Sequence, residues 1–132
     1  MSVELLVVHP EESSRQTIGR LAAEAGLRVC ESNSAVEGVL LAREAHPTAV
    51  ILNLEPPGMD GLAALALIRA QVGATARVLA FGSTDPGALK FARELGADIA
   101  MTHLDERPLQ DFLQEARRRP RRTLGAAIAS LP

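Results

Sequence analysis

The chain has 132 residues, which suits one globular domain with a single hydrophobic core. Hydrophobic residues make up 47% of it, but no run of about 18 apolar residues occurs, so we expect no membrane-spanning helix. The start of the chain reaches a charge at Glu4 and a turn residue at Pro10, a pattern that does not fit a signal peptide. The net charge is −2. Together these features predict a cytoplasmic globular protein.

Cysteine and aromatic residues are scarce. Cys30 has no second cysteine to pair with, and because it lies in an apolar run we expect it to pack as a small hydrophobic residue in a reducing compartment. The aromatic residues are Phe81, Phe91 and Phe112. So few aromatic rings argue against a surface that stacks on the bases of single-stranded nucleic acid.

The charge is distributed unevenly along the chain. Residues 117–122 hold five of the 14 basic residues and no acidic one, whereas all 16 acidic residues precede them. This basic segment, Arg117 to Arg122, could contact nucleic acid or an acidic protein surface. The ordinary alternative is a solvated helix end, where arginines also complement the helix dipole.

Five short apolar runs alternate with segments of helical periodicity. The runs predict strands at residues 5–8, 27–30, 49–52, 77–81 and 98–101. Residues that favour helix starts follow the runs; they are Ser13 or Ser14, Ser34, Asp60, Asp85 and Asp105. Ser34 with Glu37 forms a capping-box pattern, and Pro86 after Asp85 suits the first helical position.

Apolar spacing predicts which helical residues face the core. In the first two helices they are Ile18, Leu21, Ala22 and Ala25, then Val36, Val39 and Leu40. In the third and last helices they are Leu62, Leu65, Ala66 and Ile68, then Leu109, Phe112, Leu113 and Ala116.

Strands joined by helical crossovers predict a five-stranded parallel sheet covered on both faces, which is a doubly wound α/β domain over residues 1–119. Residues 120–132 are interpreted as a basic, alanine-rich tail or linker. In such a sheet, ligands bind beyond the carboxyl ends of the strands. The residues at these ends are His9, Asn53, Gly82 and His103.

Two separated motifs carry a resemblance to a known family. Asn53 ends an apolar strand and is followed by a Pro-Pro-Gly turn and by Met59-Asp60-Gly61, and Gly96-Ala97-Asp98 precedes the last strand. At this separation the motifs resemble those of the response-regulator receiver domain, the CheY-like module of two-component signalling. The resemblance covers residues 3–116 and implies a (βα)5 flavodoxin-like fold.

The resemblance also implies where the phosphorylation site would lie, and each of its positions has changed. The phosphate-accepting aspartate is replaced by Asn53, and the two acidic residues that bind Mg²⁺ by His9 and Pro10. The other positions are the hydroxyl residue, the lysine and the switch aromatic. The hydroxyl position is occupied by Gly82, with Ser83 and Thr84 beside it. The lysine position is occupied by His103 and the switch-aromatic position by Ala100.

These replacements predict a degenerate receiver, or pseudo-receiver, that keeps the scaffold and has lost phosphoryl transfer. An amide cannot attack a phosphoryl donor, proline offers no ligand atom, and histidine is a poor Mg²⁺ ligand. Glu11 alone would make a weak site. We therefore expect no enzymatic activity, no cofactor and no metal, and a fold that is stable without Mg²⁺ because clustered carboxylates are absent.

The resemblance further implies that partners or a second copy bind the face made by the fourth helix, fifth strand and fifth helix. On this chain that face would contain Leu89, Lys90, Arg93, Ala100, Met101, Asp111 and Glu115. The mixture of charges suits a reciprocal contact in a homodimer.

Three alternatives stay open from the sequence. A displaced hydroxyl, on Ser83 or Thr84, could accept phosphate. The Arg117 to Arg122 segment could bind DNA. His9 and His103 could hold a transition metal with help from Asn53 or Glu11, although no motif of paired metal ligands supports this. Other enzyme classes are disfavoured, since the chain has no glycine-rich phosphate loop and no Gly-x-Ser-x-Gly elbow.

Overall fold

A computed structural model of the chain describes residues 3–55 and 59–118. The strands are β1 (Leu5–Val8), β2 (Val29–Ser32), β3 (Ala49–Asn53), β4 (Arg77–Phe81) and β5 (Ile99–Met101). The helices are α1 (Glu12–Glu24), α2 (Ala35–Ala45), α3 (Gly61–Val72), α4 (Pro86–Leu95) and α5 (Glu106–Arg118). The predicted tail, residues 120–132, lies outside the described residues.

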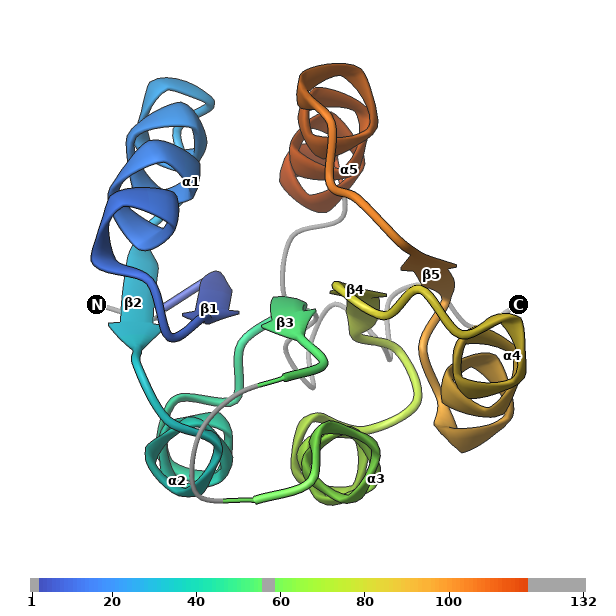
Figure 1. Cartoon of the computed structure of the whole chain (residues 1–132). Coiled ribbons are helices and arrows are strands. Elements are labelled where there is room, and N and C mark those ends of the chain that lie inside the picture. The colour runs from blue at the N-terminus through green and yellow to red at the C-terminus, as the bar shows by residue number, and fades with distance from the viewer. Residues whose placement is uncertain (1–2, 56–58, 119–132) are drawn as a thin grey trace, which may run out of the picture.

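The strands form one parallel sheet in the order β2-β1-β3-β4-β5. Helices α1 and α5 cover one face, and α2, α3 and α4 cover the other (Figure 1). The strand order reverses between β1 and β3, and this is where a doubly wound sheet places its ligands. The predicted fold class, a doubly wound five-stranded α/β domain, is confirmed.

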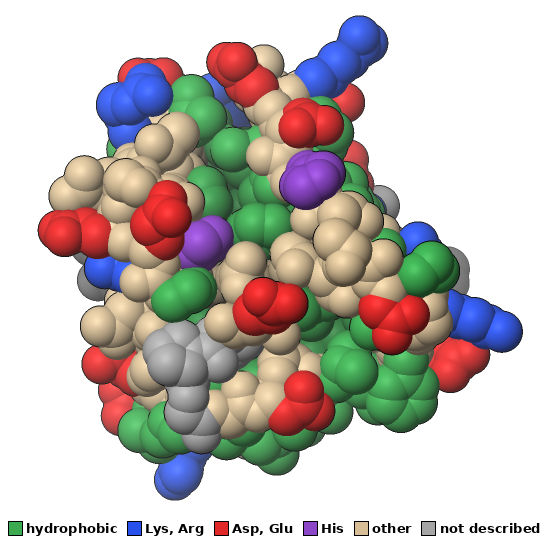
Figure 2. Space-filling view, in the orientation of Figure 1, with side chains coloured by type: hydrophobic (Ala, Val, Ile, Leu, Met, Phe, Trp, Pro, Cys, Tyr) green, Lys and Arg blue, Asp and Glu red, His purple; other side chains and the backbone are tan. Residues whose placement is uncertain are grey.

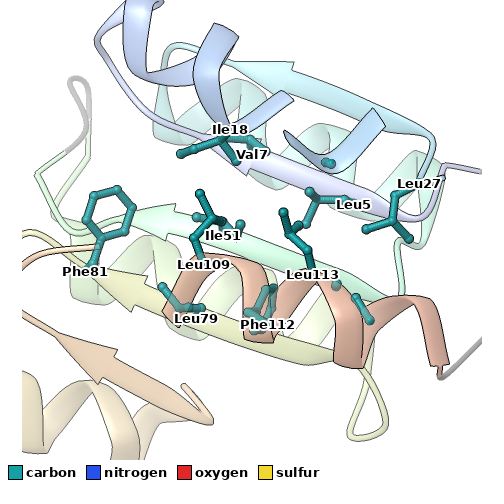
Figure 3. Packing of buried hydrophobic residues seen from close by; sticks show 13 residues of the cluster. Leu5, Val7, Ile18, Leu27, Ile51, Leu79, Phe81, Leu109, Phe112 and Leu113 are labelled. Atoms are coloured by element: carbon teal, nitrogen blue, oxygen red, sulfur yellow. The ribbon is translucent and has the colours of Figure 1, made fainter. Parts of the chain in front are cut away.

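The hydrophobic core lies in two layers, one on each face of the sheet, because each strand of a parallel sheet buries both of its faces. All four residues of β1 are fully buried, as are Ala49 to Leu52 in β3. Figure 3 shows the layer under α1 and α5, where Ile51 and Leu79 of the sheet meet Leu109 and Phe112 of α5. The core residues predicted for α5 are confirmed.

The predicted core face of α2 is wrong at Val36 and Leu40, whereas Val39 is partly buried and packs against the core. Val36 and Leu40 are each 49% exposed, and the residues turned to the sheet are Ala35, Gly38 and Ala42. A Cβ on Gly38 would lie 2.7 Å from a methyl carbon of Val8, so α2 sits closer to β1 than any larger residue would allow. Small side chains thus decide which face of α2 meets the sheet, and Val36 and Leu40 face outward.

Several local predictions differ from the structure. Strand β2 begins two residues later than predicted, and Leu27 is buried ahead of the strand. The N-cap of α1 is Glu11, and Ser13 and Ser14 donate hydrogen bonds to its side chain instead of capping the helix themselves.

Among the other predicted caps, Ser34 and Asp85 each accept a backbone N–H, but the Ser34 N–H donates to Ser32 Oγ at 3.2 Å and not to Glu37 as in the predicted capping box. Asp60 occupies the N-cap of α3 without a side-chain hydrogen bond to the helix. Its replacement by alanine should therefore cost less than the ~1 kcal/mol typical of a bonded cap.

Cys30 lies half-buried in β2 and packs against the core layer that faces α2 and α3, as the sequence predicts for a small hydrophobic residue. Burial raises the pKa of its thiol, which therefore stays protonated and unreactive near neutral pH.

Within the described part of the chain, every helix is too short or too polar to span a lipid bilayer.

Candidate functional site

The carboxyl ends of β1, β3 and β4 lie side by side, because these strands are neighbours in the sheet. This brings together His9, Asn53 and Gly82, as predicted. His103 follows β5, which two strands separate from β1. Figure 2 views this edge and shows two histidine side chains set apart, with hydrophobic and other side chains between them.

Asn53 and Gly82 form the centre of the site. The side-chain amide oxygen of Asn53, Oδ1, accepts a hydrogen bond from the backbone N–H of Glu55 at 2.9 Å, which fixes the side-chain rotamer of Asn53. A Cβ on Gly82 would lie only 2.7 Å from the Asn53 amide nitrogen, and Gly82 has φ +105°, a conformation that favours glycine. The asparagine amide therefore fills the space that a side chain at position 82 would need.

His9 is packed into the site as a neutral ring. Its Nδ1 accepts a hydrogen bond from the backbone N–H of Glu11 at 3.0 Å, so Nδ1 carries no proton. The ring lies 5.5 Å from the Phe81 ring, centroid to centroid, at 40°. Burial lowers the pKa of His9, Glu11 opposes this shift, and Arg15 adds to it. The neutral imidazole is thus the form that this site stabilises.

Glu11 does not reach into the site. Its carboxylate is exposed and accepts hydrogen bonds from Ser13 at 2.8 Å and Ser14 at 2.7 Å. These hydroxyls lower the pKa of Glu11. Arg15 donates to the carbonyl oxygens of His9 and Pro10, at 2.8 and 3.1 Å, and so holds the turn after β1 in place.

The hydroxyls beside Gly82 lie at the start of α4. Ser83 Oγ accepts the backbone N–H of Asp85 at 3.1 Å, and Thr84 is exposed. Neither corresponds to the predicted hydroxyl position, because Gly82 itself follows β4 and its N–H donates to the carbonyl oxygens of Met101 and Thr102. His103 is exposed.

The residues at this edge do not fit a Mg²⁺ ion, which needs hard oxygen ligands, usually carboxylates. His9 presents a nitrogen that is already hydrogen-bonded, Pro10 has no ligand atom, and the carboxylate of Glu11 faces α1. Across residues 3–55 and 59–118, no group of three or more His, Cys, Asp or Glu side chains could hold a metal ion. The His9–His103 metal alternative also lacks support, since these residues follow non-adjacent strands.

Sequence reasoning missed two residues of the site, Phe81 and Arg15. Phe81 reads as the last apolar residue of a strand, and its contact with His9 depends on how β1 and β4 are staggered across β3. Arg15 reads as an ordinary helix-surface residue, although its side chain is only 16% exposed. A partly buried arginine in the first helical turn after a site loop would indicate a role in the site, but the burial of a residue cannot be seen in a single sequence.

The residues predicted for a partner face belong to α4, to the edge strand β5 and to α5; Figure 1 shows these three elements. Lys90, Arg93 and Asp111 are exposed, whereas Leu89, Met101 and Glu115 are half-buried. Ala100 is wrong as a contact residue, since it is 7% exposed and packs in the same core cluster as Ala92.

Of the basic segment, Arg117 and Arg118 end α5, and the Arg117 guanidinium lies near Gly26. Residues 119–122 lie outside the described residues.

No protein-family model matches the sequence, and no curated protein matches it. Solved structures do match. A CheY-like receiver domain protein from Methanospirillum hungatei JF-1 has a TM-score of 0.79 at 17% identity, covering 89% of this chain and 95% of the other.

Two further solved structures carry groups that bear on the site. The receiver domain of sensor histidine kinase PA1611 from Pseudomonas aeruginosa PAO1, with magnesium coordinated in its active-site cleft, has a TM-score of 0.75 at 21% identity, covering 90% of this chain and all of that one. A response regulator from Burkholderia pseudomallei, with a phosphorylated aspartic acid and a calcium ion, has a TM-score of 0.76 at 20% identity. The match covers 89% of this chain and 69% of that one.

The chain therefore has the fold of CheY-like response-regulator receiver domains, as the motifs predict. At identities of about one residue in five, the likeness establishes the fold, and the activity has to be argued from the residues of the site.

The contact between Gly82 and Asn53 predicts a specific stability cost. Gly82→Ala should destabilise the protein by about 1–2 kcal/mol through its positive φ and by about 1–3 kcal/mol more through crowding against Asn53. The Asn53→Ala background is the control, because it removes the atoms that an added Cβ would meet and leaves the positive φ of Gly82 in place. Urea unfolding should show that Gly82→Ala costs less in this background than in the wild type. Equal costs of Gly82→Ala in the two backgrounds would contradict the contact.

The lowered pKa of His9 predicts a pH-dependent stability. Between that lowered pKa and the ordinary value of 6.5, the folded protein binds fewer protons than the unfolded chain. The free energy of unfolding should therefore fall as pH decreases through 6.5. In a His9→Gln variant the part of this fall that His9 causes between pH 8 and 5 should be lost, whereas His103→Gln should show the same pH dependence of the free energy of unfolding as the wild type. Identical pH profiles for wild type and His9→Gln in urea unfolding would refute the assignment.

Proposed function

We propose that this domain is a pseudo-receiver of a two-component or related regulatory system, which signals by binding a protein partner without being phosphorylated. The observation that carries the proposal is the pair formed by Asn53 and Gly82. Asn53 ends β3 where the receiver resemblance requires an aspartate, and its amide packs over a glycine where that resemblance requires a hydroxyl side chain.

The chemistry of phosphoryl transfer supports this proposal. The accepting group must be a nucleophile, and an amide oxygen engaged with the Glu55 N–H is not one. Transfer also needs positive charge to stabilise the transferred phosphoryl group, usually from Mg²⁺ and a lysine or arginine. The edge offers a neutral His9 and an exposed His103 in the corresponding places, and its residues do not fit Mg²⁺.

The site is also built to stay in one conformation. The Gly82 N–H is shared between two carbonyl oxygens of the β5 end, and the Leu54 N–H bonds the Phe81 carbonyl oxygen at 2.7 Å. Ala100 has no ring that could move between a buried and an exposed position, as the switch aromatic implied by the resemblance would. A domain of this kind would present its partner surface permanently.

The α4–β5–α5 face is the partner surface that we propose, because it combines exposed charge with accessible apolar area. Lys90 on α4 and Asp111 on α5 are exposed on either side of the edge strand. A recess of about 430 Å³ lies between the sheet and α5 and is lined by Arg77, Ile99, Arg107, Pro108, Asp111 and Phe112. Mixed charge around an apolar floor is typical of an interface that recognises a protein.

The absence of phosphorylation can be tested directly. Incubation of the 132-residue chain with Mg²⁺ and acetyl phosphate should give no phosphate adduct by mass spectrometry, and neither should Asn53→Asp, because the Mg²⁺ ligands and the lysine are still missing. A receiver domain with an intact acceptor aspartate serves as the positive control. An acid-stable adduct on Ser83 or Thr84 would instead establish the displaced-hydroxyl alternative and overturn the proposal.

The proposed partner surface predicts a binding pattern. Proteins that the immobilised chain retains from an extract of its source cells should be the same with and without acetyl phosphate. Lys90→Glu combined with Asp111→Lys should abolish their retention, because both charges of the face are reversed. Arg20→Glu, an exposed charge on α1, is the control and should have no effect. Retention that survives the double reversal would exclude this face.

A further inference from the structure

The outer surface of helices α2 and α3 is unusually apolar. Among the described residues, four large hydrophobic side chains are exposed, and three of them lie here: Val36 at 49%, Leu40 at 49% and Leu67 at 44%. The two helices pack side by side over one face of the sheet (Figure 1). The surface defined by Val36, Leu40, Ala63, Ala66, Leu67 and Ala70 is called the α2–α3 surface below.

Helix α3 turns no charged group to solvent along this surface. Its single charged residue is Arg69. That guanidinium donates to the carbonyl oxygens of Gly73, Ala76 and Gly96 and pairs with Asp98 at 2.9 Å, on the side that faces α4 and β5. Apart from Arg69 and Gln71 the helix is apolar, its outer side included, and an apolar outer side is typical of a helix that is covered there.

The two helices have complementary shapes. On α2, Val36, Leu40 and Arg43 follow one another at spacings of four and three residues and therefore lie on one side of the helix, where they form a ridge. On α3, Ala63, Ala66 and Ala70 follow one another at spacings of three and four and form a stripe of small side chains, a shallow groove with the exposed Leu67 along one side. Each stripe spans eight residues and begins in the first turn of its helix, so the ridge matches the groove in length.

A two-fold axis parallel to the helices would place the α2 ridge of each copy over the α3 groove of the other. Leu40 would then pack near Ala66 of the second copy. Arg43 would lie over the last turn of α3 of the second copy, where the helix dipole favours a positive charge. Because α3 has no charged residue on this surface, the α2 ridge would meet no charged side chain of α3 in the second copy.

We propose that the α2–α3 surface is the interface of a homodimer, with a second copy of this chain as its occupant. A face two helices wide and about 17 Å long is smaller than the ~800 Å² per partner of a standard interface. The dimer should therefore be reversible and should dissociate at micromolar concentrations. Its surface lies away from the α4–β5–α5 face, so it goes beyond the proposed function and does not depend on it.

Sedimentation velocity of the full 132-residue chain over a concentration series tests the proposal. The wild type should shift from monomer to dimer as its concentration rises from about 1 to several hundred micromolar, as expected for an interface below standard size. Leu40→Glu and Leu67→Glu should each raise the dissociation constant at least tenfold, because each buries a carboxylate in an apolar contact. Thermal unfolding should be nearly unchanged, since both positions are exposed in the monomer.

Phe91→Glu is the matched control. Phe91 is 47% exposed, as much as Leu40, and lies on α4 outside the α2–α3 surface. This variant should dimerise like the wild type, as should the Lys90→Glu, Asp111→Lys double variant. A wild type that stays monomeric throughout, or a dimer that persists in both α2–α3 variants, would overturn the proposal. Loss of the dimer in the Lys90→Glu, Asp111→Lys variant alone would also overturn it, because the dimer interface would then lie on the α4–β5–α5 face.

Discussion

The burial of the three central strands on both faces is the constraint on which the rest of the molecule depends. Each residue of β1, and each residue of β3 up to Leu52, has no accessible surface, so these strands can hold only apolar side chains of fitting size. Their ends are free of that constraint. Residues such as His9, Asn53 and Gly82 can therefore differ from those of other proteins with this fold without cost to the core. The fold and the chemistry at its edge vary independently for this reason.

The edge residues of this chain are adapted to one another. The Asn53 amide needs a glycine at position 82, and the Gly82 backbone conformation would be strained in any other residue. His9 has an apolar neighbour in Phe81, which suits a neutral ring, and its free nitrogen lone pair is used by the Glu11 N–H. A cluster of carboxylates would repel itself at such an edge unless a cation were bound. Here neutral groups hydrogen-bond to the backbone of the site, so we expect the arrangement to need no ion for its stability.

The fold could be predicted from the sequence because the apolar runs at β1 and β4 coincide with the strands residue for residue, and the motifs around Asn53 and Gly96 added a family resemblance. The failures have physical causes. The core face of α2 was misassigned because Gly38 and two alanines let the backbone approach Val8, and side-chain size in one sequence does not reveal which face makes such an approach. The site residues at strand ends were found, but the His9–Phe81 contact depends on strand stagger, which the sequence does not encode locally. Ala100 was placed on a surface because position in a family pattern carries no information on burial.

Arg69 gives the molecule a mechanical linkage. Its guanidinium ties α3 to the carbonyl oxygens of Ala76 and Gly96 and to Asp98, and Asp98 in turn accepts the N–H of Val78 at 2.8 Å. An axial displacement of α3 must either pull the α4–β5 connection with it or break several hydrogen bonds, each worth on the order of 1 kcal/mol or more. The Arg69 side chain thus adds a polar connection between α3, the α4–β5 connection and the start of β4 to the direct packing of α3 against α4.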